Sequence, residues 1–168
     1  MADAPGAWRI EPLDDDHRRA DFSCGTEALD RYLRVQAGQD SRKRVTSCFV
    51  LAAADRSVRG YYTLSATSIA LTDLPPGIAR KLPRYPVLPA TLLGRLAVDR
   101  RLQGRRFGEL LLFDAFARTL RSEIASYTFV VDAMNDAALA FYGRYRFLPL
   151  PGGGQRLFLP LAEIAALF

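Results

Sequence analysis

The stretch Leu92–Leu112, which reads LLGRLAVDRRLQGRRFGELLL, decides the fold of this chain. Its first seven residues, Leu92–Val98, form an apolar run that is long enough for one strand but short for a helix. A basic turn that contains a glycine follows, and from Gly108 the apolar residues recur at helical spacing. This order points several backbone N–H groups, and the positive end of a helix dipole, at one place. The stretch therefore favours an anion site that suits phosphate groups.

An ordinary strand-to-helix connection with solvated arginines has a similar composition, because a glycine turn before a helix is a weak signal by itself. The order of the residues is more informative. RLAVDRRLQGRRFG resembles the signature of the GNAT acetyltransferases, in which an L-x-V-like strand end precedes Q/R-x-x-G-x-G/A. Gln103 and Gly108 match this signature, whereas Arg106 stands at its first glycine. The resemblance implies that backbone amides hold the pyrophosphate of acetyl-CoA. Either Gly104 and the Arg106 amide still do so, or the affinity for the coenzyme is altered.

The resemblance implies contacts to acetyl-CoA along the strand end, through the turn and at one residue after the next strand. The implied residues are Leu96, Ala97, Val98, Arg101, Gln103, Gly104, Arg105, Arg106, Gly108 and Asn135. A turn-forming asparagine is an equally good interpretation of Asn135.

Hydrophobic periodicity and turn residues predict the other elements. We expect strands at Trp8–Leu13, Val45–Ala53, Val58–Ser65 and Tyr127–Val131, and a hairpin of Phe147–Leu150 with Arg156–Leu159. We expect helices at Glu27–Lys43, Pro76–Leu82, Gly108–Glu123 and Ala137–Tyr145, with a proline-rich loop over most of Asp73–Pro89. The whole chain, residues 1–168, is expected to form one α+β domain with the GNAT fold. That fold is a mixed, mainly antiparallel sheet flanked by helices, with one parallel crossover.

Four further segments carry a narrower resemblance: FSCGTEALDRYLRVQAGQDSRKR, GYYTLSATSI, RYPVLPATLLGRLAVDRRLQG and FYGRYRFLPLPGGGQRLFLPL. They are similar to the GNAT toxins of bacterial type II toxin–antitoxin modules. The similarity implies an acetyl-CoA-dependent enzyme that acetylates the α-amino group of aminoacyl-tRNA and blocks translation. It also implies a ribbon-helix-helix antitoxin as partner, and a homodimer. A hydrophobic C-terminal tail, Leu159–Phe168, would serve an interface or cover the sheet.

The chemistry needs a neutral amine, an oxyanion site and a proton for the leaving thiolate. An α-amino group has a pKa of about 8, so roughly a tenth of it is neutral at pH 7 and a strong base is optional. AFYGRYRF resembles the family's A-x-x-F-Y-x-x-x-G-F motif, except that Arg146 replaces its glycine. The match makes Tyr142 the proton donor, although helical spacing alone does not separate it from Tyr145 or from a core aromatic role. The backbone N–H of Val98 is the expected oxyanion donor.

The charge is positive and uneven. The net charge is +5, and Arg80–Arg106 holds eight Lys or Arg residues against one acid, Asp99. A second basic group lies between Arg31 and Arg44, and one coenzyme does not need both. The surplus favours a polyanionic partner, although a solvated basic face has equal weight. The candidate tRNA-binding residues are Arg31, Arg34, Arg42, Lys43, Arg44, Arg84 and Arg95, of which Arg95 also suits a place in the active-site cleft.

No apolar run approaches 18 residues, so we expect no membrane span. Cys24 and Cys48 match no metal spacing and are expected to be reduced cytosolic thiols, and His17 is expected to be exposed. We therefore expect a bacterial cytoplasmic protein without a metal. Two alternatives stay open: a GNAT enzyme for a small amine or a protein N-terminus, and a binding module that has lost acetyl-CoA.

Overall fold

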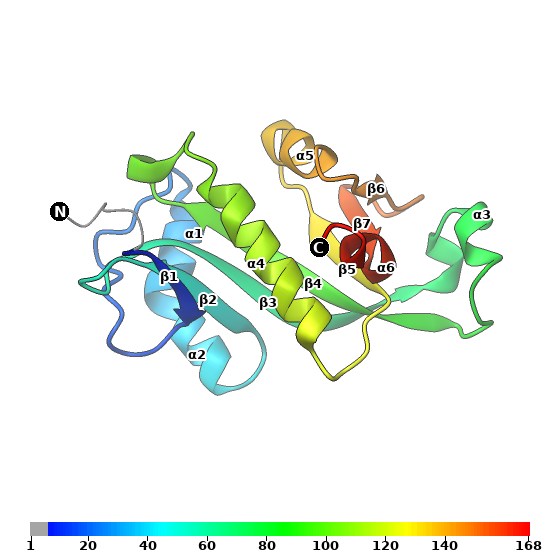
Figure 1. Ribbon diagram of the computed structural model, residues 1–168, viewed down its shortest axis with the longest axis horizontal. Coiled ribbons are helices and arrows are strands. Elements are labelled where there is room, and N and C mark those ends of the chain that lie inside the picture. The colour runs from blue at the N-terminus through cyan, green and yellow to red at the C-terminus, as the bar shows by residue number, and fades with distance from the viewer. Residues whose placement is uncertain (1–6) are drawn as a thin grey trace. The chain divides into compact units, whose positions relative to one another are not determined.

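Figure 1 shows the computed structural model of the chain, which describes residues 7–168. The strands are β1 (Arg9–Pro12), β2 (Ser47–Ala52), β3 (Val58–Ala70), β4 (Val87–Val98), β5 (Thr128–Asp132), β6 (Leu148–Pro149) and β7 (Arg156–Pro160). The α-helices are α1 (Glu27–Arg31), α2 (Ala37–Arg42), α3 (Pro76–Ala79), α4 (Phe107–Arg121), α5 (Asp136–Gly143) and α6 (Leu161–Ala165). A π-helical turn, η1 (Tyr32–Gln36), joins α1 to α2, and η2 (Leu71–Asp73) and η3 (Arg100–Leu102) are 3₁₀ turns.

The hydrogen-bonded strand order is β1-β2-β3-β4-β5-β7-β6. Strand β2 pairs antiparallel with both β1 and β3, and β7 pairs antiparallel with both β5 and β6. Strands β4 and β5 are parallel, with Ala90 opposite Thr128 and Leu93 opposite Val131. The predicted α+β class, with a mixed and mainly antiparallel sheet and one parallel pair, is confirmed.

The chain forms two compact units. The first contains the described residues up to Ser65 together with Gly94–Ala117, and the second contains Ala66–Leu93 together with Arg118–Phe168. Each unit is made of two separate stretches of the chain, and the boundaries between the units fall within β3, β4 and α4. The single domain expected from the sequence stays a prediction.

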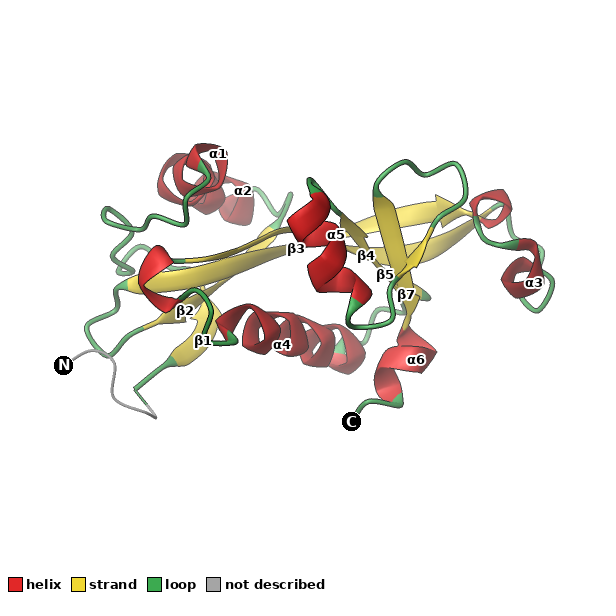
Figure 2. Ribbon diagram, turned by 90° about the horizontal axis from the view of Figure 1, so that it is seen from above, coloured by secondary structure: helices red, strands yellow, loops and turns green. Residues whose placement is uncertain are grey.

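The first unit has helices on both faces of its strands. Figure 2 shows α1 and α2 on one face of β2 and β3, and α4 on the opposite face. On the α1 side the core is aromatic: the ring of Tyr61 meets Phe22 edge-on at 5.7 Å and stacks with Tyr32 at 6.3 Å. The Tyr61 hydroxyl donates to the carbonyl of Leu29 at 2.7 Å. This bond satisfies the polar end of a ring that is fully buried.

The predicted helix Glu27–Lys43 is helical almost throughout, but its middle turn is π-helical. Thr26 is the N-cap residue, as predicted, although its side chain makes no capping hydrogen bond. The π turn begins at Tyr32, whose hydroxyl donates to Asp40 Oδ2 at 2.8 Å. Apolar spacing predicts a helix but does not distinguish an α turn from a π turn, because one extra residue per turn changes the pattern only locally.

In the second unit, β4 begins at Val87 and not at Leu92, so the prediction of a loop as far as Pro89 is wrong. Leu88 and Ala90 are buried and the residues between and before them are exposed, which is the alternation of a strand. Pro89 lies one residue before the β4–β5 register begins, at Ala90 opposite Thr128, and its carbonyl accepts from the N–H of Tyr127 at 2.8 Å. Leu88 packs in a core cluster with Ile69, Val130 and Phe158.

His17 is buried, so the expectation of an exposed histidine is wrong. Its Nδ1 accepts from the N–H of Asp14 at 3.0 Å, and its Nε2 lies 2.9 Å from Glu11 Oε1. These two contacts tie the segment after β1 to that strand. Within residues 7–168 no helix is long and apolar enough to cross a bilayer.

We expect Gly60→Ala to lower the free energy of unfolding by about 1–3 kcal/mol, because overpacking a core has this cost. An added Cβ on this β3 residue would lie 3.1 Å from Leu111 Cδ1 and 3.2 Å from the carbonyl oxygen of Ala97. Chemical denaturation measures the loss. Gly143→Ala is the control, because nothing lies within 4 Å of its added Cβ. Equal stabilities of the two variants would contradict the close approach at Gly60.

Candidate active site

The turn that follows β4 is built on one buried carboxylate. Asp99 is 1% exposed and caps η3 by accepting from the N–H of Arg101 at 3.0 Å. The Arg101 guanidinium binds both carboxylate oxygens, with Nε at 2.8 Å and Nη2 at 2.9 Å. The N–H of Ser23 donates to the same carboxylate at 3.2 Å. A bidentate guanidinium and two backbone amides satisfy the buried charge and fix the path of the turn.

Burial alone would raise the pKa of the Asp99 carboxyl, but the hydrogen bonds from Arg101 and Ser23 outweigh it and hold the pKa below its ordinary value. The hydrogen bonds to Asp99 raise the pKa of the Arg101 guanidinium. Both groups are therefore charged at neutral pH. Arg101 was predicted to contact the coenzyme, and its guanidinium is held by Asp99 in this structure.

Gln103 connects the turn to two other segments. Its Nε2 donates to the carbonyl of Cys24 at 2.7 Å and to the carbonyl of Val98 at 2.9 Å. Val98 is the last residue of β4, and Cys24 lies in the loop before α1. The side-chain amide therefore holds the turn against the strand end. Leu96 and Ala97 precede Val98 on β4, and Gly108 is the second residue of α4.

The backbone of the turn is left-handed at two residues, Gly104 with φ +78° and Arg106 with φ +65°. Nothing lies within 4 Å of a Cβ built on Gly104, so the backbone is open there. Arg106 takes the conformation that glycine favours, although its side chain replaces the first glycine of the signature. A backbone that alternates between left-handed and other conformations is an arrangement in which successive amides can face one anion.

The turn leads directly into α4, a helix of 15 residues whose dipole is positive at that end. Phe107, the first residue of the helix, meets the ring of Trp8 edge-on at 5.6 Å. The Arg105 guanidinium lies 5.7 Å from the centre of the Phe107 ring. These contacts anchor the helix start to β1 and keep a positive charge beside it. The local geometry is therefore suited to a pyrophosphate.

Tyr142 lies in the second unit, on α5, and is 7% exposed. Its ring packs edge-on against Phe141 at 5.2 Å and Phe147 at 5.4 Å. Burial raises the pKa of its hydroxyl, so the phenol keeps its proton throughout the physiological range. No hydrogen-bond partner for this hydroxyl is found among residues 7–168. A neutral phenol without an internal acceptor is suited to donating a proton to a substrate atom.

Asn135 is the N-cap of α5, and its Oδ1 accepts from the N–H of Ala138 at 2.8 Å. This bond supports the interpretation of Asn135 as a structural residue, and its contact to the coenzyme stays a prediction. Arg146, which replaces the glycine of the family's tyrosine motif, has φ +71°. Both arginines that stand at signature glycines thus adopt the left-handed backbone conformation that favours glycine.

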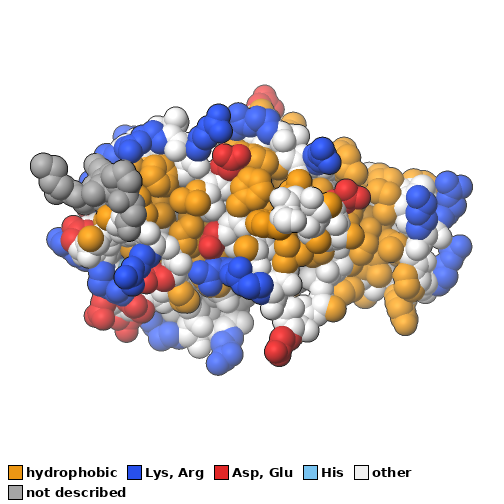
Figure 3. Space-filling model, viewed as in Figure 1, with side chains coloured by type: hydrophobic (Ala, Val, Ile, Leu, Met, Phe, Trp, Pro, Cys, Tyr) orange, Lys and Arg blue, Asp and Glu red, His pale blue; other side chains and the backbone are white. Residues whose placement is uncertain are grey.

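The predicted tRNA-binding residues divide into two groups. Arg34 donates to the carbonyl of Phe22 at 3.1 Å, and the Arg95 guanidinium lies 3.5 Å from the centre of the Tyr32 ring. These two make contacts within the first unit. The others have exposed side chains and are Arg31, Arg42, Lys43, Arg44 and Arg84. Blue Lys and Arg side chains also gather over α3 in Figure 3, where Arg80, Lys81 and Arg84 are exposed.

Sequence reasoning missed the role of Asp99 and of the Ser23–Cys24 segment. One signal was present, because Asp99 is the only acid among eight cations in Arg80–Arg106. The contact of Ser23 with Asp99 spans 76 residues, and no local pattern encodes it. Within residues 7–168, no cluster of three or more His, Cys, Asp or Glu side chains is suited to holding a metal ion.

Asp99→Asn should cost about 2 kcal/mol of unfolding free energy at pH 7, because it removes charge-assisted hydrogen bonds. The pKa of Asp99 is lowered from 3.8, so its contribution is present above about pH 4 and is lost as the pH falls below that value. Denaturant unfolding should give a larger difference between wild type and variant at pH 7 than at pH 3. A difference of the same size at both pH values would contradict the assignment.

Arg106→Gly should raise the free energy of unfolding by up to about 1 kcal/mol, because it relieves a left-handed residue. Arg105→Gly removes the same charge from the neighbouring residue, which has no positive φ. It should lower the stability by about 0.5–1 kcal/mol, because glycine loses more backbone entropy on folding. Opposite signs in urea titrations are expected, and equal destabilisation by the two changes would argue against strain at Arg106.

The chain resembles solved and curated proteins along almost its whole length, although no protein-family model matches it. A tRNA-acetylating toxin of Mycobacterium tuberculosis is 38% identical over 161 residues, which is 95% of this chain and 93% of the relative. The structure of AtaT complexed with acetyl-methionyl-tRNAfMet has a TM-score of 0.87 at 33% identity, covering 96% of this chain and 99% of that one. A tyrosine-to-phenylalanine mutant of KacT gives 0.89 at 30% identity, with the same coverage of both chains. The chain therefore belongs to the GNAT acetyltransferase toxins of bacterial toxin–antitoxin modules.

Proposed function

We propose that this protein transfers the acetyl group of acetyl-CoA to the α-amino group of aminoacyl-tRNA and so blocks translation in the bacterial cytoplasm. The observation that carries the proposal is the left-handed turn at Gly104 and Arg106 at the head of α4, in a chain 38% identical to a tRNA-acetylating toxin. The match to AtaT complexed with acetyl-methionyl-tRNAfMet supports the substrate class. A matched structure of AtaTR bound with AcCoA supports the acetyl donor.

In this mechanism the amides of the turn, from Gln103 to Gly108, bind the pyrophosphate of acetyl-CoA. The side chains of Asp99 and Gln103 hold the turn in its conformation, and the N–H of Val98 meets the developing oxyanion. The amine nitrogen attacks the thioester carbonyl, the C–S bond breaks, and the thiolate takes the proton of Tyr142. The attacking nitrogen releases its extra proton to solvent, and solvent returns a proton to the Tyr142 phenolate, so the amide and the free thiol are formed and the phenol is restored. An α-amino group is partly neutral at pH 7, so a strong base is not required. The coenzyme contacts assigned to Leu96, Ala97, Arg101 and Asn135 belong to the same proposal.

The surface arginines and lysine are assigned to the tRNA. Lys43, Arg44 and Arg84 have exposed side chains, and their contacts would be made to phosphates, with affinity that falls as salt rises. Arg34 and Arg95 stay in the proposal as residues that shape this surface, because both are held by contacts inside the first unit.

The antitoxin is proposed to be a ribbon-helix-helix protein, and the toxin a homodimer. A matched structure of an AtaT mutant bound to the C-terminus of the antitoxin AtaR supports a protein partner. The C-terminal tail contributes to both a core and a surface: Ile164 is fully buried, whereas Leu167 and Phe168 are 43% and 67% exposed. The exposed end of the tail is a candidate interface between two copies.

Tyr142→Phe should lower kcat by about 10²–10⁴-fold and leave the KM for acetyl-CoA nearly unchanged, because only proton donation is lost. The measurement is transfer of radiolabelled acetyl to aminoacyl-tRNA, with uncharged tRNA as the blank. Expression of wild type alone should arrest growth, and expression of the variant should not.

Tyr145→Phe is the matched control, because it removes a hydroxyl three residues further along and should keep near-wild-type transfer. The assignment of Tyr142 fails if Tyr145→Phe is the inactive variant. The proposed substrate fails if wild type labels only free small amines.

A further inference from the structure

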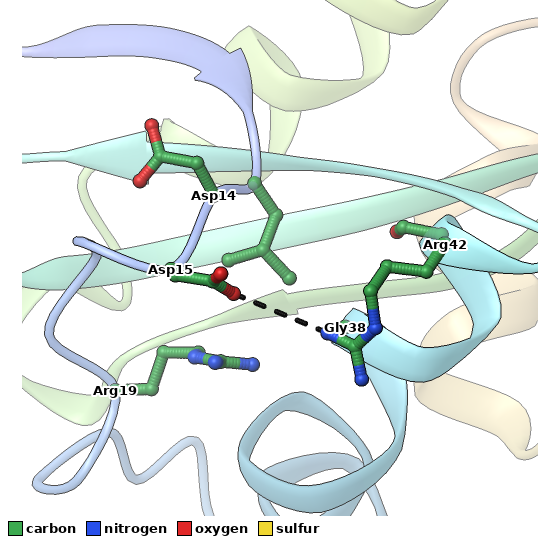
Figure 4. Close-up of a pocket in the computed structure, with 7 residues that line it drawn as sticks. Asp14, Asp15, Arg19, Gly38 and Arg42 are labelled. Carbon is green, nitrogen blue, oxygen red and sulfur yellow. Dashed lines mark ion pairs between the residues drawn. The ribbon is translucent and has the colours of Figure 1, made fainter.

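A pocket of about 210 Å³ lies in the first unit, between the segment after β1 and helix α2. It is lined by Leu13, Asp14, Asp15, Arg19, Gly38, Ser41 and Arg42. Figure 4 shows the side chain of Arg42 reaching from α2 toward Asp15, and the side chain of Arg19 pointing toward Gly38 from the segment that follows β1. The pocket is separate in sequence from the turn after β4 and from Tyr142.

Two guanidinium groups converge over Gly38. A Cβ built on this glycine would lie 3.2 Å from Arg42 Nη1 and 3.7 Å from Arg19 Nη1, so the two nitrogens are at most about 7 Å apart. Two N–H···O bonds of about 2.8 Å to different oxygens of one phosphate need a separation of roughly 5–8 Å. The absence of a side chain at Gly38 therefore lets two like charges lie no more than about 7 Å apart, which is within the reach of one phosphate.

The pocket also has a buried donor without a partner. The Ser41 hydroxyl is buried and makes no hydrogen bond within residues 7–168. A buried hydroxyl without a partner is costly, and the cost is removed when a ligand oxygen accepts its proton. Arg19 is held in place because its Nη1 donates to the carbonyl of Leu33 at 3.0 Å.

The acidic side chains of the pocket do not neutralise this pair. Asp14 is bound by Arg56, whose Nη2 lies 2.6 Å from both carboxylate oxygens. Asp15 reaches Arg42 only at 4.0 Å, and its side chain is 92% exposed. An ion pair this long and this exposed is weak, so a phosphate oxygen can replace Asp15 beside the guanidinium.

We propose that this pocket binds one phosphate group of the tRNA backbone, an inference that rests on the proposed function and adds a specific subsite to it. Arg19 and Arg42 supply the charge, the Ser41 hydroxyl supplies a neutral donor, and Gly38 keeps the space open. Lys43 and Arg44 are exposed directly after Arg42, so the basic surface continues beyond the pocket along a polyanion. This continuity favours a nucleic acid over an isolated carboxylate.

The test measures binding of uncharged tRNA to the full-length protein by filter binding over a range of salt concentrations. The double variant Arg19→Gln/Arg42→Gln should weaken binding at least about tenfold and reduce the slope of log K against log salt by about 0.9, the value for one phosphate. Arg121→Gln is the matched control. It removes one exposed charge at the end of α4 and should change neither quantity measurably.

Ser41→Ala tests whether the tRNA phosphate binds in this pocket or is attracted only by the general positive charge of the surface. It should weaken tRNA binding about threefold, as the loss of one neutral hydrogen bond does, without lowering the melting temperature. Gly38→Leu keeps every charge but fills the space between the guanidinium groups, and it should weaken binding to a similar or larger extent. Circular dichroism confirms that each variant is folded.

The proposal is overturned if Arg121→Gln weakens binding as much as the double variant Arg19→Gln/Arg42→Gln, since the effect would then be general charge. It is also overturned if Ser41→Ala and Gly38→Leu both bind tRNA like wild type. Inorganic phosphate is a separate arm, and thermal stabilisation by it without any effect of the variants on tRNA would assign the pocket to a free anion. Acetyl transfer by wild type tests the enzymatic proposal independently, so the two failures are distinguishable.

Discussion

The buried carboxylate of Asp99 is the constraint on which the candidate coenzyme site depends. A charge with 1% exposure must be neutralised and fully hydrogen-bonded, because an unpaired buried ion costs several kcal/mol. Asp99 takes its partners from Arg101 in the same turn and from Ser23, which is 76 residues away. Meeting that requirement fixes the chain between β4 and α4. Gln103 then adds bonds from the turn to the carbonyls of Cys24 and Val98, and the amides of the turn are held before any ligand arrives.

The two arginines at signature glycines indicate that the family pattern describes a backbone shape more than a residue type. Arg106 and Arg146 have φ values of +65° and +71°, where an ordinary side chain costs about 1–2 kcal/mol. Such strain persists only where the surroundings hold it, and the Asp99 and Gln103 bonds do so on one side of Arg106. What the arginine adds is a positive charge in the turn, which is compatible with an anionic coenzyme. A departure in sequence is therefore no evidence here of a lost site.

The basic residues carry the same charge in the sequence, but their burial and contacts in the structure give them different roles. Arg95 stacks on Tyr32 and Arg34 binds a carbonyl, so both serve the packing of the first unit. Arg42 comes from the same helical region, yet it faces Arg19 across an open pocket over Gly38. The second unit contributes the neutral phenol of Tyr142, which is protonated because its ring is buried among Phe141 and Phe147. The first unit thus supplies these basic side chains, and the second unit supplies the buried phenol.

The sequence by itself determined the order of the strands and helices as far as β7 and the strand–turn–helix around Gln103. These depend on local periodicity and turn residues, whereas the family was identified from the resemblance of whole motifs. Only the tertiary structure decided the burial of His17, the π turn at Tyr32, the start of β4 at Val87 and the partners of Asp99. Each of these is fixed by neighbours that are distant in sequence. Helical or strand spacing does not predict which distant group will form a hydrogen bond with a buried polar atom.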